Sequence, residues 1–131
     1  MVEVLRKEVD YDFDEAVKRV EQICSKRGFS VLATKHLDQI FKKSLNVDKY
    51  PRYTMVLACN PALAKMALDV SKDAGTLFPC SFVVYEDQGK TIVAHTSIMR
   101  VSAETGLAPE DEMEPVIKET GKHIHKVWDD I

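Results

Sequence analysis

The chain has 131 residues, of which 45% are hydrophobic and 30% are charged, and its net charge at neutral pH is −3. This length fits a single domain over residues 1–131, and the small negative charge gives no electrostatic reason to expect nucleic acid or an anionic membrane as a partner. No apolar run approaches the roughly 20 residues of a membrane-spanning helix. The three cysteines are not densely spaced, which argues against a secreted disulfide scaffold. We therefore expect a cytoplasmic protein with reduced thiols.

The N-terminal third of the chain predicts two strands and two helices. Residues 2–9 alternate loosely between apolar and charged side chains, which favours a strand. Apolar residues recur at helical spacing from Phe13 to Lys26, and Asp12 stands where a helix N-cap is expected. Residues 29–34 predict a second strand, and residues 35–45 predict a short amphipathic helix. The apolar face of that short helix contains Leu37, Ile40, Phe41 and Leu45.

The middle of the chain predicts three strands and one helix. Residues 54–59 and 80–86 are apolar at nearly every position, so we expect central strands that are covered on both faces. Residues 61–74 predict the helix between them. The Asp-Gln-Gly turn at 87–89 predicts a hairpin that leads into a fifth strand over residues 90–99.

The last third predicts a loop over residues 100–109 and then a long helix from Glu110, with Pro115 in its first turn. Gly121 either weakens this helix by about 1 kcal/mol or permits close packing against a neighbour. The order of the elements, together with the hairpin, predicts an α+β fold in which helices pack against one sheet.

The tripeptide Cys59-Asn60-Pro61 is the most specific local pattern. Asn60 can cap a helix and Pro61 fits the first helical position, so Cys59 lies just before a helix N-terminus, where the partial positive charge of the backbone favours a thiolate. Cys80 begins the next buried strand. If the strands that hold the two cysteines are antiparallel, the thiols lie at the same end of the sheet; if the strands are parallel, they lie at opposite ends.

Three features occur together in this chain: the helix and turn over residues 13–29, the motif Cys59-Asn60-Pro61-x-Leu63-Ala64, and the motif Leu77-x-Pro79-Cys80-x-x-Val83-x-Tyr85-Glu86 with the glycine hairpin after it. On these features, residues 10–100 resemble the bacterial and archaeal domain-of-unknown-function family 302. The resemblance implies an α+β fold similar to that of the TATA-box-binding-protein class. We therefore expect a curved, mainly antiparallel sheet of about five strands, with two main helices and one or two extra short helices. The family has no established activity to carry over, and it points to Cys59 and Cys80.

These patterns favour a binding module for a small molecule or a soft metal. Its site would contain Cys59, Asn60 and Cys80, with Tyr85 and His95 as weaker additions, because thiolates prefer soft metals and thiophilic ligands. No pair of candidate ligands has a tight metal-binding spacing such as Cys-x-x-Cys, so no metal is assigned.

Two alternatives remain open. In the first, the protein is an enzyme of sulfur or acyl transfer, with Cys59 as nucleophile and His95 as its base. In the second, it is an interaction or structural protein, and its cysteines are core residues. Because most soluble oligomers are twofold, a homodimer is also expected.

Overall fold

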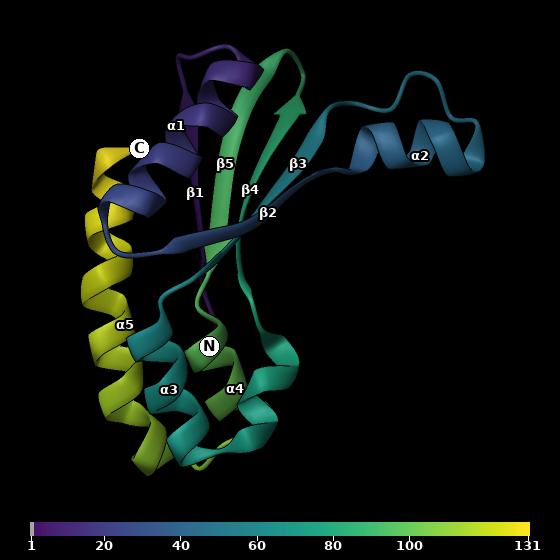
Figure 1. The fold of residues 1–131 in the computed structure, drawn as a ribbon. Coiled ribbons are helices and arrows are strands. Elements are labelled where there is room, and N and C mark those ends of the chain that lie inside the picture. The colour runs from purple at the N-terminus through teal and green to yellow at the C-terminus, as the bar shows by residue number, and fades with distance from the viewer. Residues whose placement is uncertain (1) are drawn as a thin grey trace.

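The computed structural model describes residues 2–131, which form one five-stranded sheet with helices on one face and beyond one end (Figure 1). The strand order is β1-β5-β4-β3-β2, and every neighbouring pair is antiparallel. This confirms the predicted α+β class. The strands are β1 (Val4–Val9), β2 (Ser30–His36), β3 (Tyr53–Cys59), β4 (Cys80–Asp87) and β5 (Lys90–Thr96). The helices are α1 (Phe13–Lys26), α2 (Leu37–Leu45), α3 (Pro61–Val70), the 3₁₀ helix η1 (Lys72–Leu77), α4 (Ile98–Glu104) and α5 (Glu110–Asp130).

Two helices begin at the residues that the sequence predicts. The side chain of Asp12 accepts a hydrogen bond of 2.9 Å from the Glu15 amide at the start of α1. Asn60 accepts one of 3.2 Å from the Leu63 amide at the start of α3, and Pro61 occupies the first turn. Each cap satisfies one of the amides that a helix N-terminus leaves without a partner.

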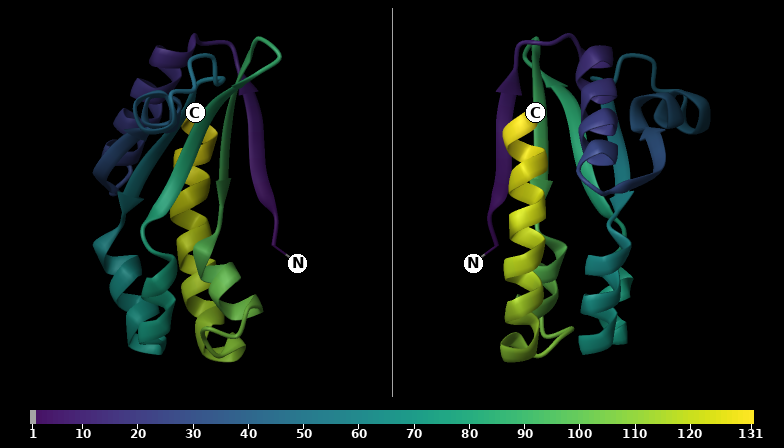
Figure 2. Two further views of the ribbon diagram at one scale, coloured as in Figure 1. Left: turned by 90° about the vertical axis from the view of Figure 1, so that its right-hand side faces the viewer. Right: turned by 60° about the vertical axis from the view of Figure 1, so that its left-hand side comes forward.

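One face of the sheet is buried beneath α1 and α5 (Figure 2, right). A second apolar cluster lies where α3, η1 and α4 meet the first half of α5, beyond the end of the sheet (Figure 1). The main core thus continues past the strands into a helical end. The core under the sheet includes Val20, Cys24, Val56, Phe82, Val84, Val93, Ile124 and Val127, and the second cluster includes Ala67, Ala74, Met99, Met113 and Ile117.

The opposite face of the sheet is not covered by a helix (Figure 2, left). Along β3, buried residues alternate with half-buried ones, so the expectation of a strand covered on both faces is wrong. The apolar side chains of this open face pack against one another instead, as the stacked rings of Tyr53 and Tyr85 show, with centroids 5.6 Å apart. Composition alone does not distinguish lateral packing within a sheet from burial beneath a second layer.

Three predicted boundaries are also wrong, and local capping explains two of them. The helix after Pro61 ends at Val70, because Ser71 caps η1 by accepting a bond from the Asp73 amide. Strand β5 ends at Thr96, because Ser97 caps α4, and this helix occupies part of the stretch predicted as a loop. The third is Pro115, which lies inside α5 rather than in its first turn.

Helix α2 forms as predicted, but its apolar face has no core to cover. None of its residues is buried, and the helix projects away from the body of the domain (Figure 1). Ile40 is 43% exposed and Leu45 is 67% exposed. We call α2 and the following segment, residues 37–50, the α2 arm. Among the described residues, no helix combines the length and apolarity needed to cross a membrane.

Candidate functional site

The antiparallel pairing of β3 and β4 places Cys59 and Cys80 at the same end of the sheet. Cys80 lies directly opposite Ala58, and Cys59 lies opposite Ser30 on β2. Side chains alternate between faces along a strand, so Cys59 points to the open face whereas Ala58 and Cys80 point to the helices. All three cysteines, including Cys24, are free thiols.

The cysteine end of the sheet holds only a very small cavity. Cys59, Asn60 and Cys80 line a space of about 20 Å³, together with Thr120 and apolar residues such as Phe78. That volume suits roughly one water molecule. Burial raises the pKa of Cys80 to about 11 and that of Cys24 to about 12, so both are protonated thiols at neutral pH.

In the described part of the chain, the histidines, cysteines and acids do not gather into a metal centre. Over residues 2–131, no group of three or more of these side chains is placed to hold a metal ion. The cysteine end therefore offers neither the space for an organic ligand nor a complete ligand set for a metal.

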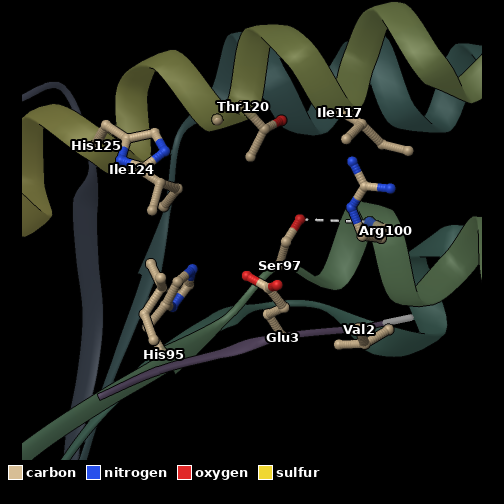
Figure 3. A pocket seen from close by; sticks show the side chains of 11 residues that line it. Val2, Glu3, His95, Ser97, Arg100, Ile117, Thr120, Ile124 and His125 are labelled. Atoms are coloured by element: carbon tan, nitrogen blue, oxygen red, sulfur yellow. Dashed lines mark hydrogen bonds between the residues drawn. The ribbon is translucent and has the colours of Figure 1, made fainter.

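A much larger cavity, of about 390 Å³, lies between the sheet and α5 (Figure 3). This volume falls within the range of small-molecule sites. Its walls come from four separate parts of the chain: the start of β1, the end of β5, the first turn of α4 and the middle of α5. The lining residues are Val2, Glu3, Leu5, His95, Ser97, Arg100, Ile117, Thr120, Gly121, Ile124 and His125.

His95 projects from β5 toward α5 and lines this cavity (Figure 3). The residue is only 3% exposed, and its ring stacks on Phe82 with centroids 4.3 Å apart. Its Nδ1 lies 2.9 Å from the carbonyl oxygen of Ser81, which can only accept a hydrogen bond. Nδ1 therefore carries the proton. Burial lowers the pKa of His95 more than the Ser81 bond raises it, so the ring is neutral at pH 7.

The other ring nitrogen of His95 has no hydrogen-bond partner within residues 2–131. Nε2 is buried, and in the neutral ring it offers a lone pair. Thr120, on α5, is also 3% exposed, and its Oγ1 is likewise buried without a partner. Buried polar groups are normally hydrogen-bonded, so two unpartnered ones in the walls of one cavity need an explanation.

Charged side chains lie at the edge of the cavity. Arg100, on α4, makes no side-chain hydrogen bond or ion pair with another described residue, and Glu3 is exposed. His125 adds a third titratable group from α5. Ser97 accepts a hydrogen bond of 3.3 Å from the Arg100 amide, which leaves its hydroxyl proton free to donate.

Gly121 lines the cavity next to Thr120. A Cβ atom at this position would meet nothing within 4 Å, so of the two interpretations of this glycine the structure favours the one without close packing. An alanine would fit and would suit a helix better by about 1 kcal/mol. The glycine leaves the wall of the cavity hollowed at this point.

The structure separates the residues that the sequence grouped. Cys59, Asn60 and Cys80 meet at the small cavity, and His95 lines the large one. Tyr85 lies on the open face, where its hydroxyl accepts a hydrogen bond of 3.2 Å from Arg6. The sequence reasoning missed Thr120 and Arg100. Thr120 has a weak signal, since it is a polar residue on the apolar stripe of a predicted helix; Arg100 has none, since it fell in a predicted loop.

The fold and its cavity define a small antiparallel α+β domain with helices on one face of the sheet. The chain belongs to the family described as "Domain of unknown function DUF302", which matches residues 5–131. It is also similar to a solved structure, that of the uncharacterized conserved protein DUF302 from Bacillus stearothermophilus. That match has 20% sequence identity and a TM-score of 0.85, and it covers 97% of this chain and 96% of the other. At this identity the likeness shows the fold alone. The comparison with curated proteins found no match.

Proposed function

We propose that this domain is a cytoplasmic small-molecule-binding module whose site is the cavity between β5 and α5. One observation carries the proposal: His95 Nε2 and Thr120 Oγ1 are both buried, both lack a partner among the described residues, and both belong to residues that line the cavity. Leaving such groups unpaired costs free energy, and a ligand that bonds them recovers it.

The test is a fragment screen by heteronuclear NMR on the whole chain. Binding at the proposed site shifts the backbone amides of Ser97 and Gly121, which line only the large cavity, while the amides of the α2 arm stay unchanged. Fragments that shift only residues around Cys59 would favour a thiol site instead. A screen that shifts neither group would contradict a ligand-binding function.

The cysteine-centred alternatives have less support. A nucleophilic Cys59 needs a base within hydrogen-bond reach, and the histidine expected to act as that base, His95, lines the other cavity and bonds the Ser81 carbonyl through Nδ1. The soft-metal form of the proposal has no cluster of ligands among residues 2–131. Thiol labelling tests both the nucleophilic and the metal-binding role of Cys59.

A homodimer is the second candidate, and the α2 arm supports it. Exposed apolar side chains gather along and beside the arm, and the arm extends from the side of the sheet that no helix covers (Figures 1 and 2). In a twofold pair, each arm can therefore cover the open face of the other copy, an arrangement in which both copies use the same surface. The exposed apolar residues are Leu32, Ile40, Leu45, Val47 and Tyr50.

A further inference from the structure

The polar groups of the large cavity differ in what they can bond. The neutral ring of His95 has its proton on Nδ1, so Nε2 can only accept. A ligand group that meets Nε2 must therefore bring an O–H or N–H donor. The Thr120 hydroxyl can donate or accept, so it can bond the same ligand group, which must still bring a donor to His95 Nε2.

The edge of the cavity favours an anion. Arg100 forms no ion pair with another residue in the described part of the chain, and a guanidinium has five N–H donors that suit a carboxylate. The free hydroxyl of Ser97 provides a further donor nearby (Figure 3). Glu3 also faces this space but is exposed, so solvent screens its charge. His125 faces the cavity from α5.

Part of the cavity wall is aliphatic. Leu5, Ile117 and Ile124 line it. A ligand that reaches from Arg100 to His95 therefore places a short hydrocarbon portion against aliphatic side chains.

From these three features we infer that the cavity binds a small organic carboxylate that also carries a hydroxyl or amino hydrogen-bond donor. The carboxylate pairs with Arg100 and Ser97, the donor bonds His95 Nε2, and the hydrocarbon between them contacts the aliphatic wall. This inference rests on the proposed function, because it names the ligand class of the same site.

Matched probes test each feature separately. Para-hydroxybenzoate and beta-hydroxybutyrate contain both groups, benzoate and butyrate lack the donor, phenol lacks the acid, and benzylamine replaces the acid with a cation. Calorimetric titration of the whole chain should give the lowest Kd for a hydroxy acid. Loss of the donor should raise Kd roughly two- to tenfold, and loss of the acid should raise it roughly tenfold or more.

Variants assign these differences to residues. In Arg100→Gln, the hydroxy acid and phenol should bind alike, and Arg100→Lys should restore part of the preference for the acid. In His95→Phe, which retains an aromatic ring against Phe82, the hydroxy acid and its deoxy counterpart should bind alike. Arg6→Gln, on the open face, is the matched control and should leave every Kd unchanged.

The outcomes separate the ligand class from the function. The ligand class is wrong if phenol, benzylamine, benzoate or butyrate binds as tightly as the hydroxy acids. In that case the cavity is still a binding site. If no probe binds and the fragment screen shifts no cavity amide, the proposed function is wrong as well. If no probe binds but other fragments shift the cavity amides, only the ligand class is wrong. Since Arg100→Gln removes a half-buried side chain at the edge, its result stands even if His95→Phe fails to fold.

Discussion

His95 and Ser81 are joined across β5 and β4 by a hydrogen bond of 2.9 Å between the ring Nδ1 and the backbone carbonyl oxygen. The bond fixes which nitrogen carries the proton, so the chemistry that the ring presents to the cavity is set by the backbone of the neighbouring strand. Protonation of the ring would place a second N–H, and a charge, in a buried position without a partner among the described residues.

The first prediction concerns stability against pH. Burial lowers the pKa of His95 below the ordinary 6.5, so between the lowered value and 6.5 the unfolded chain binds more protons than the folded one. The contribution of His95 to the free energy of unfolding is therefore complete above pH 6.5 and decreases as the pH falls through that window. The slope for one such group reaches about 1.4 kcal/mol per pH unit.

Urea denaturation of wild type and His95→Gln over this pH range measures the effect. The difference between their free energies of unfolding should shrink toward acid pH, while His123→Gln shows what the loss of a histidine outside the cavity does. Parallel curves for wild type and His95→Gln would show that the ring titrates alike in both states, which contradicts its burial as a neutral group.

The second prediction compares two buried threonines. Thr120→Val removes a hydroxyl that has no hydrogen-bond partner within residues 2–131 and should raise the free energy of unfolding by about 1 kcal/mol. Thr54→Val is the matched control. It removes a hydroxyl bonded to His36 Nδ1 at 2.8 Å and should lower the free energy of unfolding by about 1 kcal/mol. Denaturation curves measure both. Equal losses for the two variants would mean that Thr120 has a partner after all.

The third prediction concerns the thiols. Native protein treated with a thiol reagent and read by mass spectrometry should be modified first at Cys59, which is half-buried. Cys24 and Cys80 should react only on unfolding, because both are buried and their pKa values are raised to about 12 and about 11. Cys59→Ser should abolish native labelling, and Cys24→Ser should preserve it. Fast native labelling of Cys80 would overturn this order.

The fourth prediction concerns self-association. Leu45→Glu introduces a charge at a side chain that is 67% exposed on the α2 arm. If two copies meet through this arm, sedimentation should show a dimer in the wild type and a monomer in Leu45→Glu. Lys43→Gln, on the same helix, should remain dimeric. A wild type that sediments as a monomer at high concentration would exclude this interface.

The sequence was sufficient to predict those parts of the structure that a local pattern of residues determines. Asp12 and Asn60 marked helix starts, because a cap requires only a short polar side chain and the next few amides. The α+β class followed from element order and the hairpin. The hairpin also placed His95 in a fifth strand, which its pairing with Phe82 on β4 confirms.

The large cavity could not be predicted in the same way. Leu5, Arg100 and Thr120 are far apart in the chain. They line one cavity only once β1 has paired with β5 and α5 has packed on the sheet. Ser97 was included in a strand, so the helix that carries Arg100 was missed. Helix α2 shows the opposite case: its amphipathic pattern is real, but a pattern does not say whether the apolar face meets this chain or another.

The position of the cavity has one more consequence. Its walls include Glu3, Leu5, Ile124 and His125, and within the sheet the edge strand β1 pairs only with β5. A molecule bound in the cavity would contact both the edge strand β1 and the C-terminal helix α5. Fraying of β1 would then require release of the bound molecule, so occupancy would slow amide exchange along this edge strand.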